Sequence, residues 1–320
     1  MDNVTEGGPS LNSHVFMAYS VLLVVVAVVA GLLIGFNIFA LLMATSIPRP
    51  VRFFLINLLL AGLLVAAVEV FVGTTSAVLV PVGTHHPAPP YLCRVYLWLF
   101  ASGVTARLWN LAAFALSVLA IVRFSKKTIT PGLTAIIISI LWLVPLTMTL
   151  YVLLPYVYEV QFVHGVACFP DNNRTIIIQA RHTFLAIWII FGGLTPVTVS
   201  IVVPIYCLCY IRKNIVTEGT QYRKGMAKFS LFLMVGGAIN ILGQVLPGLL
   251  TYYSTATGVY LSYGSAAVSL LPTPIIILAY LKPVRDKLQT LFTCGRKIRR
   301  EAVSKAAASL EGTVVTEADV

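Results

Sequence analysis

The chain has 320 residues, of which 58% are hydrophobic and 10% are charged, and its formal net charge at pH 7 is +11. Ordinary globular domains carry about 25% charged residues, so this composition excludes a soluble protein and indicates that much of the apolar surface contacts lipid. The basic residues cluster beside apolar segments, so the positive charge reports membrane topology and not nucleic-acid binding.

At the start of the chain, residues 1–14 are polar and include Asp2 and Glu6, with no basic group ahead of the first apolar run. We therefore expect no cleavable signal peptide and interpret residues 1–14 as an extracellular N-terminus. The first apolar stretch is then an uncleaved signal anchor. Asn3 begins an Asn-Val-Thr sequon and is a predicted glycosylation site.

Seven apolar stretches follow, and each is long enough to cross a bilayer as a helix of about 20 residues. Turn and charge signals separate them, whereas a β-barrel would show short alternating segments. The sequence therefore predicts an all-α membrane protein with a seven-transmembrane helix bundle over residues 15–281. The stretches are 15–45, 53–80, 93–124, 133–155, 184–210, 229–252 and 259–281.

The distribution of Lys and Arg predicts the orientation of these spans. Two lie in the first connection, three at the third, five in the fifth and eight in the C-terminal tail, which makes 18 of the 22 on one side. Because basic loops stay in the cytoplasm, we expect the C-terminus inside and the N-terminus outside a plasma-membrane protein. A second sequon, at Asn173, falls on the predicted outer side and agrees.

The cysteines and histidines follow the same division. Cys93 and Cys168 both lie on the predicted outer, oxidising side, where no other cysteine competes, so we expect a disulfide between them. Cys207 and Cys209 are interpreted as ordinary membrane-helix residues. The five histidines are outside or at the outer edge, and we favour solvated loop residues over a metal or proton sensor.

Glu69 and Arg107 are the ionisable residues that fall well inside the predicted spans. A charge at a helix centre costs about 2.5–3.5 kcal/mol on insertion scales, so neither should face lipid. Counted from the outer span ends, they lie roughly 16 and 21 Å deep, which predicts an ion pair between the second and third helices. Such a pair is either structural or part of a ligand pocket in which Arg107 attracts an anionic or carbonyl group. Further candidate pocket residues, for which packing is the alternative, are Trp98, Trp109, Asn110 and Gln244.

After the seventh stretch, Val284, Leu288, Leu291 and Phe292 recur at helical spacing with basic residues elsewhere on the wheel. This pattern predicts an amphipathic helix over 282–294 that lies on the inner leaflet and contacts membrane lipids. Cys294 is a candidate for palmitoylation. Residues 295–320 are small and polar, and we expect them to be a disordered cytoplasmic tail.

Several of these features together resemble the rhodopsin-like (class A) G-protein-coupled receptors over nearly the whole chain. The topology, the sequons and the Cys93–Cys168 pair are similar to that family. The resemblance implies an extracellular ligand, coupling to a heterotrimeric G protein, and Asn37, Pro204, Pro247, Pro274 and Arg123 as switch or coupling residues. The motifs that carry the resemblance are Gly35-Phe36-Asn37, Asn57-Leu58, Trp142, Pro204, Pro247 and the run Pro272-Thr273-Pro274-Ile275-Ile276-Ile277.

The chain also departs from the family at several switch positions. Gly62 stands where the family usually has a sodium-site aspartate, and Val122-Arg123-Phe124 stands for Asp-Arg-Tyr. Val245, Thr273 and Ile277 replace the usual tryptophan, asparagine and tyrosine. No lysine occurs in the seventh stretch, where opsins hold retinal, so no cofactor is predicted.

The alternatives to a signalling receptor are an enzyme, a transporter or channel, and a receptor-like protein that no longer couples to G protein. Motifs of hydrolases, zinc proteases and P-loop enzymes do not occur in the sequence, so an enzyme is not predicted. A transporter or channel is disfavoured by the lack of an internal repeat and by the single acid within the spans. The altered switch residues leave open a receptor-like protein that no longer couples to G protein.

Overall fold

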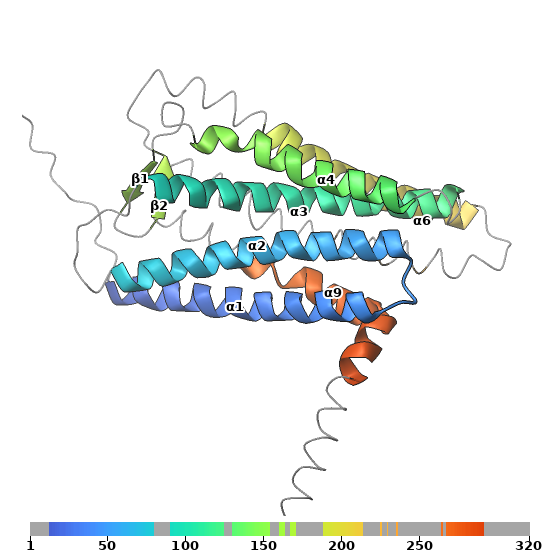
Figure 1. The fold of residues 1–320 in the computed structure, drawn as a ribbon, viewed down its shortest axis with the longest axis horizontal. Coiled ribbons are helices and arrows are strands. Elements are labelled where there is room, and N and C mark those ends of the chain that lie inside the picture. Colours follow the sequence, from blue (N-terminus) through green and yellow to red (C-terminus); the bar gives the residue numbers. More distant parts are fainter. Residues whose placement is uncertain are drawn as a thin grey trace, which may run out of the picture.

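The computed structural model describes residues 13–79, 90–124, 130–153, 160–163, 167–170, 188–213 and 267–290, together with residues 225, 229, 235 and 264. Within these residues the chain is a bundle of long helices that lie side by side (Figure 1). The elements in chain order are α1 (Ser13–Met43), α2 (Arg49–Leu79), α3 (Pro90–Phe124), α4 (Pro131–Met148), η1 (Leu150–Leu153), β1 (Val160–Val163), β2 (Ala167–Pro170), η2 (Trp188–Leu194), α6 (Thr195–Lys213) and α9 (Pro272–Tyr280).

Five of the described helices are long and apolar enough to span a membrane, and they confirm the first five predicted spans. Lipid offers the backbone no hydrogen-bond partners, so a spanning segment satisfies its N–H and C=O groups within a helix. The sixth predicted span, 229–252, lies outside the described residues except for Phe229 and Val235, which are both helical. The five segments are Ala18–Met43, Arg49–Thr75, Arg94–Ala120, Pro131–Met148 and Ile190–Tyr210.

Helix α3 occupies the centre of the described bundle. It contacts α2 on one side and α4 and α6 on the other, while α1 contacts both α2 and α9. In Figure 1, α1 and α2 lie below α3, and α4 and α6 lie above it. Any change in the position of α3 therefore reaches both halves of the bundle.

The two ends of the bundle differ in structure. At one end, here called the hairpin end, β1 and β2 form an antiparallel pair beside the start of α3. Phe162 pairs with Cys168, which places the backbone of Cys168 in this hairpin. The hairpin was not predicted from sequence. The side chains of Cys93 and Cys168 lie outside the described residues, so their disulfide stays a prediction.

At the opposite end, here called the tail end, the chain turns sharply after α9. The segment Ala267–Tyr280 and a further helix, Lys282–Thr290, meet at 90°. We call Lys282–Thr290 the tail helix. Its Val284 and Leu288 are buried while its basic residues are exposed, as the amphipathic pattern requires. The helix is the short eighth helix expected from the sequence, described as far as Thr290.

Prolines account for the irregular helix ends. Leu271 N–H bonds to Val268 C=O at 3.2 Å, three residues back, because Pro272 and Pro274 lack the N–H groups that would continue an α-helix. At the junction of η2 and α6, the Thr195 hydroxyl donates to Ile190 C=O at 2.8 Å, just before Pro196. Helix α4 ends at Met148 and continues as the short 3₁₀ helix η1, so the α-helical part of the predicted span 133–155 ends at Met148.

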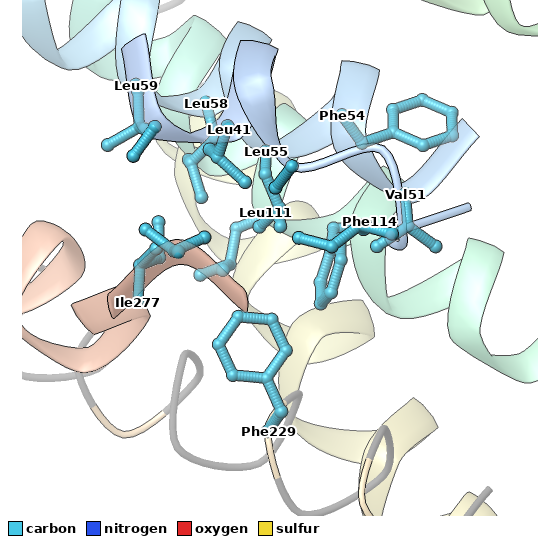
Figure 2. Packing of buried hydrophobic residues seen from close by; sticks show 14 of the residues in the cluster. Leu41, Val51, Phe54, Leu55, Leu58, Leu59, Leu111, Phe114, Phe229 and Ile277 are labelled. Carbon is cyan, nitrogen blue, oxygen red and sulfur yellow. The ribbon is translucent and has the colours of Figure 1, made fainter. Parts of the chain in front are cut away.

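Apolar side chains fill the bundle toward the tail end. Phe114 of α3 meets Phe229 edge to face, with ring centroids 5.7 Å apart and planes at 85°. Apolar transfer contributes little between helices in lipid, so close packing of such groups stabilises the bundle. We call this group the tail-end core, and Figure 2 labels ten of its members: Leu41, Val51, Phe54, Leu55, Leu58, Leu59, Leu111, Phe114, Phe229 and Ile277.

Candidate functional site

Four of the buried polar and charged residues, Asn57, Glu69, Arg107 and Asn110, lie on α2 and α3. On α3 they follow helical spacing, so their side chains share one face. Contacts with α2 are observed at several points of this face, and we call the two facing rows the α2–α3 seam. From the tail end to the hairpin end, the α3 row is Phe114, Asn110, Arg107, Gly103, Phe100 and Tyr96, and the α2 row is Asn57, Gly62, Val65 and Glu69.

A closed hydrogen-bond network lies at the tail-end part of the seam. The indole N–H of Trp142 donates to Asn57 Oδ1 at 2.6 Å, and Asn57 Nδ2 donates to Asn110 Oδ1. Asn110 Nδ2 in turn donates to Ala106 C=O at 2.7 Å. These side chains link α4, α2 and α3. Asn110, a candidate pocket residue, therefore uses both polar atoms of its side chain in structural hydrogen bonds.

Arg107 lies one turn nearer the hairpin end and is 7% exposed. Its Nη2 donates to the backbone C=O of Ser269 at 3.1 Å, within the interrupted turn before α9. Gly62 of α2 lies opposite, where an added Cβ would come 3.8 Å from Arg107 Nε. The guanidinium links α3 to the seventh span.

Glu69 is fully buried on α2, and the expected ion pair with Arg107 is not formed. Both carboxylate oxygens are buried and have no hydrogen-bond partner among the described residues. An unpaired polar group in such surroundings costs about 1–3 kcal/mol by protein mutational data. Within the part of the chain that the structure describes, the carboxyl group of Glu69 therefore has no hydrogen-bond donor.

The relative positions of α2 and α3 explain why the ion-pair prediction was wrong. An added Cβ on Gly103 would come 2.8 Å from Val65 Cγ2, so these two positions lie at one level, as do Gly62 and Arg107. Since the helices run in opposite directions, Glu69 stands level with Phe100, seven residues from Arg107. At 1.5 Å per residue the separation along the axis is about 10 Å. Helix α3 begins at Pro90 and not at Cys93, which moves Arg107 deeper than predicted.

Aromatic and apolar side chains surround the level of Glu69. Val65 and Ala66, one turn before Glu69, belong to a buried apolar cluster against which Phe100 packs. Tyr96 is 4% exposed and stacks on Phe100, with ring centroids 6.2 Å apart and planes at 20°. We call this group the mid-bundle cluster; its buried members are Ala30, Val65, Ala66, Val104 and Leu270.

The remaining pocket candidates lie elsewhere. Trp98 donates its indole N–H to Leu146 C=O at 3.1 Å and so contacts α4. Trp109 packs against the tail-end core, and its indole nitrogen is buried without a hydrogen-bond partner among the described residues. Gln244 lies outside the described residues, as do the predicted modification sites Asn3, Asn173 and Cys294.

The candidate switch residues divide between core and surface. Asn37 is fully buried and donates Nδ2 to Leu33 C=O at 2.7 Å. Pro204 and Pro274 are buried within α6 and α9. Arg123 is exposed in the last turn of α3, at the tail end. Pro247 lies outside the described residues.

Sequence reasoning missed two parts of the site: the Ser269 carbonyl and the Tyr96–Phe100 pair. The prolines at 272 and 274 signal an interrupted helix whose carbonyls accept other donors. The four-residue spacing of Tyr96 and Phe100 signals a shared helix face. Both signals were present, but neither indicated which helix lies opposite.

The sequence and the fold are both similar to those of known proteins. The chain matches the family model described as "7 transmembrane receptor (rhodopsin family)" over residues 35–309. Among solved structures, the crystal structure of squid rhodopsin is similar with a TM-score of 0.68 and 13% sequence identity, covering 88% of this chain and 87% of that one. At that identity the likeness concerns the fold alone. The comparison with curated proteins gives no match.

Proposed function

The chain belongs to the rhodopsin family of seven-transmembrane receptors, and on that premise we propose that it binds its ligand at the hairpin-end part of the α2–α3 seam. As a member of that family it is a multi-pass plasma-membrane G-protein-coupled receptor and not an enzyme. The observation that carries the proposed ligand site is Glu69, a fully buried acid without a hydrogen-bond partner among the described residues. A group on the ligand would supply a hydrogen-bond partner for the Glu69 carboxyl.

The proposed orientation places the hairpin end outside the cell and the tail end in the cytoplasm. It is supported by the Lys and Arg residues, which gather in the connections at the tail end and in the C-terminal region. Tags on the two termini of intact cells test this: an N-terminal tag should be accessible to antibody and a C-terminal tag should not. Access to both tags from the same side would contradict the proposed topology.

Signal transmission is proposed to run along α3. Ligand bound beside Glu69 would contact α3. On the same helix, Arg107 donates to the Ser269 carbonyl and Phe114 packs on Phe229. A ligand that favours a different position of α3 shifts the balance between two packings at the tail end. The G protein would then meet the tail-end surface, which includes Arg123.

An activation assay on cells that express the chain tests the coupling. We expect the wild-type receptor to activate a heterotrimeric G protein in response to cell-surface ligand, with surface display measured in parallel. Phe229→Ala is the matched variant, because it alters the Phe114 contact at the tail end without touching the Glu69 level. It should change the ratio of basal to stimulated activity at equal surface display.

A second candidate function is a receptor-like protein that no longer couples. It is supported by Ile277, which stands where the family usually has a switch tyrosine and is fully buried in the tail-end core. An isoleucine has no hydroxyl to exchange hydrogen bonds when the helices move. Ligand binding without G-protein activation, at normal surface display, would favour this function over the first. Substrate flux across the membrane would instead favour a transporter.

A further inference from the structure

We propose that Glu69, Phe100 and Tyr96 form the recognition site for a primary ammonium group on the ligand of this receptor. The inference rests on the proposed function, because it names the chemical class of the ligand at that same part of the seam. It starts from the carboxyl group of Glu69, which is fully buried and has both oxygens unpaired within the described residues. A buried acid of this kind is completed by a cation or by a hydrogen-bond donor.

Among the described residues, the nearby basic side chains do not supply that cation. Arg107 lies about 10 Å deeper along the bundle axis and gives its Nη2 to Ser269 C=O. Arg94, toward the hairpin end, precedes Tyr96 by two residues and so points to the opposite side of α3. Its Nε is buried without a hydrogen-bond partner among the described residues, so it forms no such bond with Glu69.

An aromatic wall stands at the level of Glu69. Phe100 packs on the mid-bundle cluster that contains Val65, one turn below Glu69 on the same face of α2. Tyr96 stacks on Phe100 with a centroid separation of 6.2 Å and extends the aromatic surface toward the hairpin end. Aromatic faces attract cations through their quadrupole, most strongly away from water. A buried carboxylate at the level of two aromatic rings therefore matches a small organic cation.

A metal ion fits this site less well than an ammonium group. In the described part of the chain, no group of three His, Cys, Asp or Glu residues is placed to hold a metal, and hard cations take six or more oxygen ligands. A primary ammonium needs only the carboxylate, an aromatic face and a few further contacts. Glu69 lies ten residues from Leu79 at the end of α2, about 15 Å from the hairpin end.

The test uses the full-length receptor purified in lipid nanodiscs, with benzylammonium as the probe and benzyl alcohol as its neutral match. The thermal midpoint is measured against probe concentration for wild type, Glu69→Gln and Phe100→Leu. The matched control is Ser200→Ala, which removes another buried polar group, a hydroxyl bonded to Pro196 C=O of its own helix at 2.6 Å. Glu69→Gln keeps the shape of the side chain and removes the charge.

We expect benzylammonium, and not benzyl alcohol, to raise the midpoint of the wild type and of Ser200→Ala equally. Glu69→Gln should need about tenfold more probe for the same rise, since it loses a charge-assisted contact. Phe100→Leu should need about threefold more, since it loses the cation–π part. Equal effects of amine and alcohol on wild type would overturn the proposal, and that comparison stands even if Glu69→Gln fails to fold. Equal amine effects on wild type and Glu69→Gln would overturn it as well.

The proposed receptor function is read separately, by G-protein activation in cells. Failure of the amine to stabilise the purified protein, together with G-protein activation by the expressed chain, would reject the ligand class and leave the receptor standing. Selective stabilisation by the amine without G-protein activation would support the ligand class and reject the coupling.

Discussion

The two ends of the α2–α3 seam use similar polar residues in opposite ways. Toward the tail end, Asn57, Asn110 and Trp142 satisfy one another and lie beside a densely packed apolar core. Toward the hairpin end, Glu69 is buried as deeply but has no partner among the described residues. A polar group whose bonds are complete stabilises the bundle, whereas an incomplete one lowers stability and is available to a ligand. Burial alone therefore does not distinguish a structural residue from a recognition residue.

The largest effect should come from emptying the tail-end core. Phe114→Ala removes a fully buried ring that packs edge to face on Phe229, and such truncations cost about 3–5 kcal/mol. The free energy of unfolding, measured by denaturant titration in mixed micelles, should fall by that amount. Phe100→Ala is the control at the other end of the seam and should cost less, because Phe100 is only partly buried. Equal losses would contradict the difference in packing.

Breaking the closed network should have the next largest effect. Asn57→Leu leaves the indole N–H of Trp142 and the amide of Asn110 without their partner. Each buried group that loses its bond costs about 1–3 kcal/mol, so the thermal midpoint should fall clearly. Trp142→Phe removes one member alone and should cost less. A midpoint unchanged in Asn57→Leu would show that the network adds nothing to stability.

A steric test probes the middle of the seam. Gly103→Ala places a methyl group 2.8 Å from Val65 Cγ2, so the helices must separate slightly; overpacking of this kind costs about 1–3 kcal/mol. Gly62→Ala is the matched control, because its closest contact would be Ile34 Cδ1 at 3.3 Å. The thermal midpoint should fall more in Gly103→Ala. The reverse order would mean that α2 and α3 do not meet at Gly103 and Val65.

The smallest effect should have the opposite sign. Glu69→Leu removes a carboxyl that has no partner among the described residues, and it should raise the free energy of unfolding by about 1 kcal/mol. The same variant should lose its response to benzylammonium, so stability and recognition move in opposite directions. Measurements in probe-free nanodiscs test the first effect alone. A loss of stability in Glu69→Leu would indicate that the carboxyl is satisfied in the membrane.

Much of the fold could be predicted because membrane insertion depends on local composition. The first five spans follow from runs of apolar residues, and the tail helix follows from the spacing of Val284 and Leu288. The β1–β2 hairpin and the early end of α4 could not be predicted in the same way. They depend on turn geometry and on local hydrogen bonds at helix ends, such as the Thr149 hydroxyl that donates to Pro145 C=O at 2.8 Å at the end of α4, and not on hydrophobicity.

The site was predictable in its residues but not in its pairing. The sequence by itself placed Glu69 and Arg107 within the membrane, because the cost of burying a charge applies to each residue separately. Only the tertiary structure decided that Arg107 holds Ser269 while Glu69 has no partner among the described residues. The contact between Val65 and Gly103 sets the register of α2 against α3. A register shift of a few residues moves a side chain by a full helical turn, and no single segment contains that information.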